Sequence, residues 1–590
     1  MFSKTLIVAM ATSAFIAAHT PAYAADYQWE KVLQAPVDES YFGPNDPRNS
    51  YDPLSGNHPL PGSQARRNGG YAWGVTTHGD AIWYGAFMNG WCLWLQPAGL
   101  PAPTEVTADF YNFQSPINAC DLREKNRPPV IQIFDSKTKK LSVFQSRNPD
   151  FAAAMDNLVA IRSAATVGDI IFVGGLIGGD AAAASGSMDS DDSYFFKGIR
   201  VIAINAVTKK FLGAVTIGDL NESRKMTVIA QPDGSQGLYL GASSRSGKSY
   251  LLRWTGSAAT PFPPARGDGY AGFEKVADNS GAGLIGEIQS IKDKTGQTRL
   301  VMSTWSSWPS VNKSGGLYLS SPMPAGGFHS NSKGSLKPLL ILDQFDPDPL
   351  LGPTWGGGML SVYRNKIYWG TMTIGSVYAG AYNAANPALS MSPLIRDNMA
   401  RTLYARAAHV FRIDAANPND SKIEMLFGSE YYPVVDPANG SLSYQPNKLG
   451  LKPVMGDAGF GFGTVNYSWE SAVYDDKLFV GTMDYAGGLV DYLANKKIPG
   501  DHQIKANLRI AKEQGFISGG DMLVFENDAD HPRVITRNGL GNPDVNGFRN
   551  FLTLNGALYV GTSSEANMGP TAGYAFYRLT DPSAQTGEEK

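Results

Sequence analysis

The sequence predicts an all-β protein, a seven-bladed β-propeller with small helical insertions that is closed by an N-terminal strand. The first observation is a short apolar, aromatic-rich run that ends in small residues and recurs seven times. The copies are Ile82–Ala86, Ile171–Gly175, Leu238–Ala242, Leu300–Thr304, Ile367–Thr371, Leu478–Thr482 and Leu558–Thr562. Repeats on this scale indicate stacked or radial architectures. The copies are unevenly spaced, which favours a propeller, because the loops of each blade can lengthen independently.

The second observation is that further strands follow each copy. A third strand is expected at Ile131–Asp135, Val201–Asn205, Tyr250–Trp254, Gly316–Leu319, Val410–Asp414, Met522–Glu526 and Phe576–Leu579. An outer, fourth strand is expected in six units, at Lys140–Gln145, Phe211–Ile217, Phe273–Ala277, Leu336–Leu342, Ile423–Phe427 and Val534–Arg537. Second and third strands therefore pair one to one, and this count predicts seven blades.

The third observation concerns the two ends of the chain. The last unit, with its hairpin dipeptide Asn555-Gly556, lacks an outer strand because the chain after Asp581 is short and polar. Near the N-terminus, Trp29–Val32 closely resembles the outer strand Phe273–Val276. A circular sheet assembly must be closed, or it leaves an open edge. We therefore expect Trp29–Leu33 to be the outer strand of the blade that holds Leu558–Leu579.

The chain order divides into four parts. Residues 1–24 are expected to be a signal peptide, 25–70 an N-terminal strand and irregular loop, 71–581 the propeller, and 582–590 a polar tail. Two insertions look helical: Pro387–Arg406, where Ile395, Met399 and Leu403 are spaced by four, and parts of 484–516. Two roles stay open for these insertions, packing against neighbouring blades or forming a lid over a binding site.

Export is predicted from the N-terminus. Lys4 precedes a short apolar run, Leu6–Ala18, and Ala22–Ala24 fits the small-x-small pattern of a cleavage site. The run is shorter than the roughly 20 apolar residues that a membrane helix needs, and we expect no transmembrane segment. The predicted location is therefore the periplasm or the extracellular space. The formal net charge of −3 gives no electrostatic case for binding nucleic acid.

Cys92 and Cys120 are the only two cysteines, and in an exported chain they most simply form one disulfide. Oxygen-rich loops at Asp189, Asp191 and Asp192, and at Asp346 and Asp348, are of a kind that can hold Ca²⁺, although such loops are more often solvated turns. The seven histidines form no metal-binding motif, so no catalytic copper or zinc centre is expected.

The first strand of each unit is the candidate for lining a central channel. When the units are aligned on their second strands, each carries a polar or large aromatic residue near the start of its first strand. These residues are Trp73, Arg162, Arg224, Glu287, Trp355, Glu470 and Arg549. The functional interpretation is a ring around an axial site for a small anionic or sugar-like ligand. The structural interpretation is ion pairs and stacking between blades. The sequence leaves both open.

The loops after the second strands are expected to share one face. They include Asn89, Trp91, Asp180, Arg245, Trp305, Trp308, Asp484, Tyr485 and Glu565. Exposed Trp and Tyr at loop tips often contact sugars or protein partners. The alternative is hydrophobic plugging between loops.

The units resemble those of secreted bacterial β-propellers of the broad quinoprotein-like, WD-like and kelch-like superfamily. The resemblance lies in Asn555–Thr562, Asp475–Thr482 and Val201–Lys210. It implies the fold over about residues 70–580 and no functional residues, because the signature motifs of those families are absent.

Two functions stay open. The leading one is an exported binding module that takes a small-molecule, glycan or protein ligand on one face or in the axial channel. The other is a secreted hydrolase or lyase that acts on a sugar or ester in that channel. Convergent ionisable groups with perturbed pKa values in a deep axial pocket would favour an enzyme.

Overall fold

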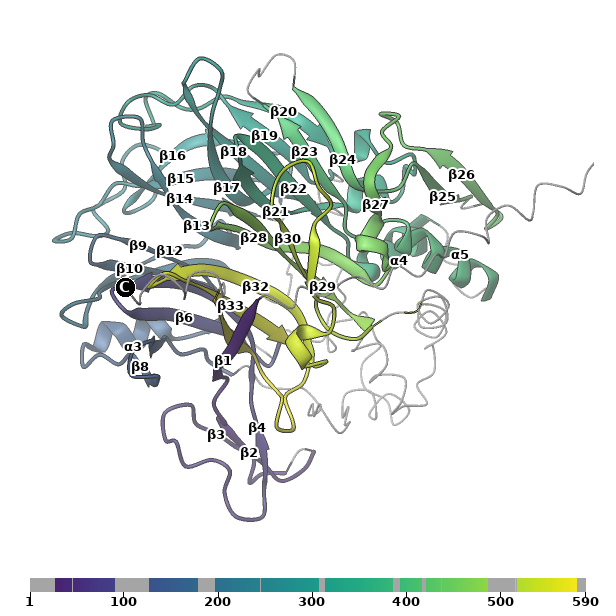
Figure 1. Cartoon of the computed structure of the whole chain (residues 1–590). Coiled ribbons are helices and arrows are strands. Elements are labelled where there is room, and N and C mark those ends of the chain that lie inside the picture. Colours follow the sequence, from purple (N-terminus) through teal and green to yellow (C-terminus); the bar gives the residue numbers. More distant parts are fainter. Residues whose placement is uncertain are drawn as a thin grey trace, which may run out of the picture.

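The computed structural model describes residues 27–44, 46–90, 127–178, 197–244, 246–306, 313–385, 393–415, 421–436, 438–486, 515 and 517–580. The expected signal peptide, the Cys92–Cys120 disulfide, the Asp189–Asp192 loop and the helical stretch after Ala486 lie outside these residues. The described chain is an all-β structure with few helices (Figure 1).

The strands form four-stranded antiparallel meanders, in which each strand pairs with the next along the chain. The first four are β5 (Gly69–His78), β6 (Ala81–Met88), β7 (Gln132–Asp135) and β8 (Lys140–Val143); β9 (Leu158–Val167), β10 (Ile170–Ile177), β11 (Gly198–Asn205) and β12 (Lys210–Ile217); β13 (Glu222–Ala230), β14 (Gln236–Ser243), β15 (Ser249–Trp254) and β16 (Phe273–Asp278); and β17 (Leu284–Lys292), β18 (Thr298–Trp305), β19 (Gly316–Ser320) and β20 (Leu336–Ile341).

The remaining meanders follow the same order. They are β21 (Gly356–Tyr363), β22 (Lys366–Met372), β23 (Val410–Asp414) and β24 (Lys422–Gly428); β28 (Val465–Tyr474), β29 (Lys477–Asp484), β30 (Met522–Phe525) and β31 (Arg533–Thr536); and β32 (Val545–Leu554), β33 (Ala557–Ser564) and β34 (Ala575–Thr580) with β1 (Gln28–Gln34). The expected second, third and outer strands are all present among these elements, with bounds shifted by up to three residues.

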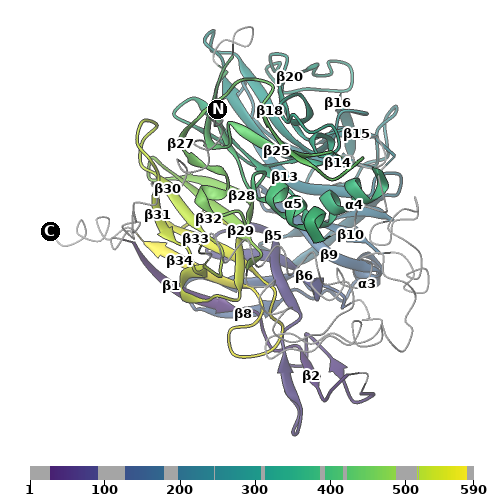
Figure 2. The ribbon, with the colours of Figure 1, turned by 90° about the vertical axis from the view of Figure 1, so that its right-hand side faces the viewer.

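The last meander takes its outer strand from the N-terminus. β1 pairs antiparallel with β34, and Trp29 lies opposite Leu579. Figure 2 shows the two strands side by side at the edge of the molecule. Val32 and Leu33 pack into the same apolar cluster as Phe576. The N-terminal strand therefore covers an edge that the end of the chain would otherwise leave open, as the sequence predicts.

Neighbouring meanders meet along their first strands. β5 contacts β9, β9 contacts β13, β13 contacts β17, β17 contacts β21, β21 contacts β28, β28 contacts β32, and β32 contacts β5. Single residue pairs also join the second strand of one meander to the first strand of the next, as in Met372 with Tyr467 and Ser563 with Tyr71. The last of these pairs links the final meander to the first one.

The repeated small residue of the second strand permits this close approach. A Cβ atom placed on Gly85, Gly370 or Gly481 would lie closer than 3.0 Å to a side chain in the first strand of the next meander. The neighbours are Ile161 and Ser468 for the first two glycines. The small residue of the sequence repeat therefore marks a close contact between neighbouring meanders as well as the end of a strand.

We expect Gly370→Ala to lower the free energy of unfolding by about 1–3 kcal/mol, because the added methyl group overpacks the contact with Ser468. Gly218→Ala is the matched control, since a Cβ there meets no atom within 4 Å. Chemical denaturation of both variants provides the measurement. Equal effects would show that the glycine is not needed for the contact.

The other elements decorate this core. β2 (Glu39–Tyr41), β3 (Ser50–Tyr51) and β4 (Gln64–Arg66) form a small sheet that projects from the body (Figure 1). β25 (Tyr431–Val435) and β26 (Leu442–Pro446) form a hairpin, and β27 (Pro453–Asp457) adds to β24 in parallel. The helices are α3 (Pro149–Met155), α4 (Gly375–Ala385) and α5 (Pro393–Tyr404). α5 confirms the helical periodicity that the sequence shows there.

The small projecting sheet corrects the expectation of an irregular loop over residues 36–70. Its strands are held by a buried polar network, since Glu39 accepts hydrogen bonds from Arg127 at 2.8 Å and from Asn68 at 2.7 Å. Burial acts the other way, but Arg66 and Arg127 lower the pKa of Glu39. Strands held mainly by charged partners show no apolar alternation, so the sequence pattern gave no signal for them.

Within the described ranges, no helix has the length and apolar character that crossing a membrane requires.

Candidate functional site

Each first strand departs from regular pairing at one shared place, beside the repeated small residue of the second strand. There the first strand carries one extra residue relative to the second strand, which is a β-bulge. The bulged residues are Trp73, Arg162, Arg224 with Lys225, Gly286, Gly358 with Met359, Trp469, and Arg549. A bulge turns a side chain out of the strand's alternating pattern, and bulges are frequent next to functional sites. Trp73, Arg162, Arg224 and Arg549 thus share one local geometry. Glu287 and Glu470 each directly follow a bulged residue.

Seven ionisable side chains from the first strands form what we call the charged cluster: Arg162, Glu222, Arg224, Lys225, Glu287, Glu470 and Arg549. Lys225 lies at its centre, because its Nζ atom is 3.0 Å from Glu287 Oε2 and 2.9 Å from Glu470 Oε2. Arg549 Nη1 lies 3.3 Å from Glu470, and Arg162 Nη1 lies 2.6 Å from Glu222. These contacts involve residues of five different meanders.

Each arginine of the charged cluster lies over a tryptophan ring. Arg162 lies 4.9 Å from the ring centroid of Trp73, Arg224 lies 4.1 Å from that of Trp305, and Arg549 lies 5.6 Å from that of Trp469. These rings belong to a set of aromatic contacts that we call the aromatic wall: Tyr71, Trp73, Trp305, Tyr467 and Trp469. Cation–π contact holds the guanidinium planes in place against the wall.

The charged cluster is mostly withdrawn from solvent. Arg224, Glu287, Glu470 and Arg549 are buried, while the Lys225 side chain keeps 31% of its exposure and connects the cluster to water. Burial and the nearby charge of Arg549 lower the pKa of Arg224 to about 9. Burial opposes the charge of Lys225 too, but Glu287 and Glu470 outweigh it and raise the pKa of Lys225. Holding several cations together here is therefore costly.

The hydrogen bonding of the charged cluster is incomplete. Among the described residues, the Nε atoms of Arg162, Arg224 and Arg549 are buried without a hydrogen-bond partner, and so is Oε1 of Glu287. The cluster also carries four cationic side chains against three carboxylates, which leaves one excess positive charge when all are ionised. Buried polar groups are normally paired, so this arrangement points to a missing anionic partner.

The structure brings most of the predicted site residues together. Trp73, Arg162, Arg224, Glu287, Glu470 and Arg549 all belong to the charged cluster or the aromatic wall. Trp355 lies elsewhere, because it precedes β21, whose bulge holds Gly358 and Met359 instead. Lys225, Glu222 and Tyr467 were missed by the sequence analysis. Lys225 shares a two-residue bulge with Arg224, and counting back from the next strand allows only one residue there.

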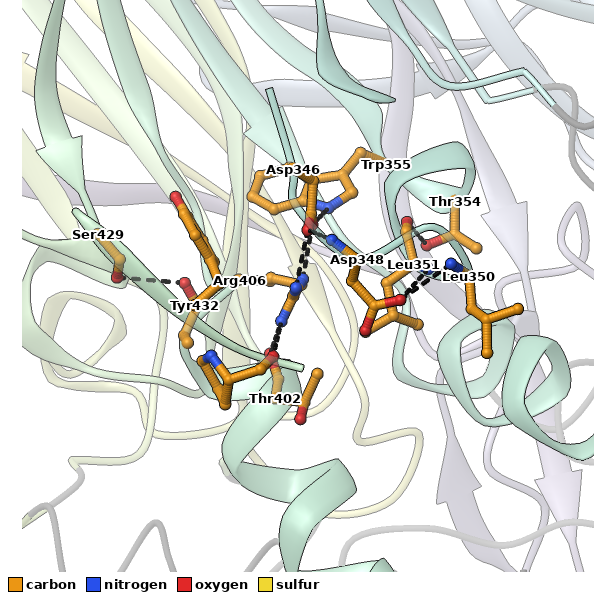
Figure 3. A network of polar contacts seen from close by, with 12 residues as sticks. Asp346, Asp348, Leu350, Leu351, Thr354, Trp355, Thr402, Arg406, Ser429 and Tyr432 are labelled. Carbon is orange, nitrogen blue, oxygen red and sulfur yellow. Dashed lines mark hydrogen bonds and ion pairs between the residues drawn. The ribbon is translucent and has the colours of Figure 1, made fainter. Parts of the chain in front are cut away.

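Trp355 belongs to a buried network on the side of α5 (Figure 3). Its indole Nε1 donates a hydrogen bond to Asp346 at 2.7 Å. Arg406 binds the same carboxylate through two hydrogen bonds, at 2.6 and 2.8 Å, and both charged side chains are fully buried. Burial lowers the pKa of the adjacent His409 to about 4. A guanidinium therefore occupies the position that a cation would take at Asp346.

Asp348 also has a protein donor, since Tyr382 donates to its carboxylate at 2.6 Å. The described residues contain no group of three or more potential metal ligands. The possible calcium loop at Asp346 and Asp348 is therefore explained by a network that anchors α4 and the segment around α5.

The described loop residues that were expected to share one face are buried or partly buried, which agrees with the alternative of hydrophobic plugging between loops. Asn89, Asp484 and Glu565 are buried, and Trp305 and Tyr485 are partly buried against the same apolar cluster as the aromatic wall. Burial raises the pKa of Asp484 well above its ordinary value. Trp91, Asp180, Arg245 and Trp308 lie outside the described residues. Among the described loop residues, Trp305 and Tyr485 therefore pack into the core cluster that contains the wall.

Comparison with solved structures finds similar architectures. The polysaccharide lyase Uly1 is 9% identical with a TM-score of 0.30, covering 71% of this chain and 89% of the lyase. The β-propeller domain of the Trilobed protease from Pyrococcus furiosus is 9% identical with a TM-score of 0.27, covering 68% and 77%. The Trypanosoma rangeli sialidase in complex with sialic acid is 8% identical with a TM-score of 0.33, covering 78% and 57%.

No protein-family model and no curated protein sequence matches this chain. The similarity to these solved structures assigns neither a family nor an activity.

Proposed function

We propose that the protein is an exported seven-bladed β-propeller whose N-terminal strand closes the ring. The pairing of β1 with β34 and the contacts of each first strand with the next, through to β32 and β5, support the closed ring. The signal-like segment at residues 1–24 supports export to the periplasm or beyond. The propeller domain then spans residues 71–581, as the repeats indicate.

We further propose that this propeller is a binding module for a small anionic ligand, which the charged cluster holds. One observation carries the proposal: buried cationic side chains from bulges of several first strands meet with one positive charge in excess and with unpaired donors. Such groups cost free energy when they are left without partners. An anion would pair with the free donors and balance the charge.

The test compares Arg549→Gln and Arg162→Gln with the parent protein. We measure binding of D-glucuronate, D-glucose 6-phosphate and D-glucose by calorimetry, together with thermal unfolding. Each variant should lose about 10- to 100-fold in affinity for a charged probe that the parent binds, because a charge-assisted hydrogen bond contributes about 1.5–3 kcal/mol. Arg364→Gln, at an exposed ion pair with Asp476, is the control and should bind like the parent.

Two results would speak against the binding module. If both variants unfold earlier yet bind the charged probes as the parent does, the charged cluster is a structural set of ion pairs. If the parent binds glucose with the same affinity as the charged probes, the excess positive charge does not select the ligand.

A hydrolase or lyase that acts on a sugar or ester is the second candidate. It is favoured by Glu287 and Glu470, two buried carboxylates that both lie within 3.0 Å of Lys225 Nζ. Many glycoside hydrolases use a pair of carboxyl groups for catalysis. Turnover of oligosaccharides that is lost in both Glu287→Gln and Glu470→Gln would establish this candidate in place of the binding module.

A further inference from the structure

The free donors of the charged cluster suit a carboxylate. Arg162 and Arg549 each use an Nη atom for a glutamate, and Arg224 directs its Nη1 atom at the sulfur of Met372. All three keep their Nε–H groups without a hydrogen-bond partner. A carboxylate accepts about four hydrogen bonds with a single negative charge. That charge equals the excess positive charge of the cluster, whereas a phosphate monoester with a charge of about −1.5 to −2 would exceed it.

The charged cluster also has a free acceptor, which a simple carboxylic acid anion cannot satisfy. Oε1 of Glu287 is buried without a hydrogen-bond partner, and its nearest cation is the Nε atom of Arg224 at 3.9 Å. The other oxygen of Glu287 already lies 3.0 Å from Lys225. A buried carboxylate oxygen needs a hydrogen-bond donor, so the ligand must bring at least one hydroxyl or N–H group besides its anionic group.

The aromatic wall adds a third requirement. Trp305, Tyr467 and Trp469 are in edge contact with one another, next to Arg224 and Arg549. Four rings of the wall are buried, whereas Trp305 is partly exposed. The indole N–H of Trp305 has no hydrogen-bond partner among the described residues, so this residue offers a donor as well as apolar ring surface. Aromatic rings with a polar handle suit a ligand that is apolar on one face and polar at its edge. A sugar ring has this form, with C–H groups on its faces and hydroxyls around its rim.

We infer that the ligand of the charged cluster is a sugar acid, a ring with free hydroxyl groups and one carboxylate. The carboxylate binds the Nε–H groups of Arg162, Arg224 and Arg549. A ring hydroxyl donates to Glu287 and another accepts from Trp305, while a face of the sugar ring lies against the partly exposed side chain of Trp305. This inference rests on the proposed function of the charged cluster and names the chemical class of its ligand.

The test uses probes that separate these requirements, measured by calorimetry on the full chain. D-glucuronate, D-galacturonate and N-acetylneuraminate have both the carboxylate and the hydroxyls. D-glucose has hydroxyls only, cyclohexanecarboxylate has the carboxylate only, and D-glucose 6-phosphate has hydroxyls and a more highly charged anion. We expect at least one sugar acid to bind 10-fold or more tightly than each of the three comparison probes.

Two variants locate the contacts. Trp305→Phe keeps a ring beside Arg224 but removes the indole N–H, and it should weaken sugar-acid binding several-fold without changing the affinity for cyclohexanecarboxylate. Glu287→Gln should weaken sugar-acid binding in the same selective way, and its thermal unfolding shows whether the fold has survived. If the Glu287 variant does not fold, the Trp305 variant decides the question.

The outcomes separate the inference from the proposed function. If glucose 6-phosphate or cyclohexanecarboxylate binds as tightly as every sugar acid, the inference fails but an anion-binding cluster remains. An unchanged sugar-acid affinity in Trp305→Phe likewise overturns the proposed hydroxyl contact. If no charged probe binds to the parent protein, both the inference and the proposed binding function fall.

Discussion

Deletion of residues 25–35 is expected to remove most of the stability of the protein. The deletion takes away β1, which among the described residues is the outer partner of β34, and so it uncovers the edge of β34. It also uncovers apolar surface, because Tyr27, Val32 and Leu33 pack into two core clusters. Partial burial of four or five such side chains is worth about 5 kcal/mol, which is comparable with the whole stability of many domains.

Thermal and denaturant unfolding of the purified chain provide the measurement. Deletion of residues 582–590, the polar tail, is the matched control and should leave the unfolding transition where it is. If the deletion of residues 25–35 leaves the melting temperature unchanged, β1 is an accessory strand. The proposal that β1 closes the ring would then be wrong.

Replacement of Arg406 by Met should cost about 3–5 kcal/mol of unfolding free energy. Arg406 and Asp346 are fully buried, and the guanidinium holds both oxygens of the carboxylate. Removing the cation leaves Asp346 charged in the protein interior, with Trp355 as its remaining side-chain donor in Figure 3. An unpaired buried charge is strongly unfavourable, whereas an exposed pair contributes little.

Two comparisons make this result specific. Arg364→Met breaks an exposed ion pair with Asp476 of the same 2.6 Å length and should cost less than about 1 kcal/mol. The double variant Arg406→Met with Asp346→Leu removes both charges and should recover much of the loss. If the double variant is as unstable as the sum of the two single ones, the loss comes from packing and not from an unpaired charge.

The strand pattern was accessible from the sequence because it is local. The repeated run that includes Leu478–Thr482 alternates with turns, and its core positions lie within a few residues of one another. The outer strand at the N-terminus was accessible for the same reason, since Trp29–Val32 resembles Phe273–Val276. The small sheet β2–β4 was missed, because its strands depend on Glu39 and its distant partners Arg66 and Arg127.

The site was predictable where the bulge and turn lengths agree between meanders. Trp73 and Arg549 occupy the bulges of β5 and β32, and counting back from the following strand finds both. The count missed Lys225, because in β13 two residues, Arg224 and Lys225, lie opposite Gly241. It was wrong at Trp355, which precedes β21, whereas the bulge of that strand lies at Gly358 and Met359. A bulge is decided by how two strands fit, which a single strand's sequence does not record.

The sequence by itself therefore determined the strands, their order and the pairing of the N-terminal strand with the last unit, because apolar periodicity and turn residues act over short distances. Only the tertiary structure decided that Lys225 lies between Glu287 and Glu470, and that each cluster arginine lies over a tryptophan from another strand. The physical reason is that a buried charge is tolerated only where partners from distant parts of the chain surround it.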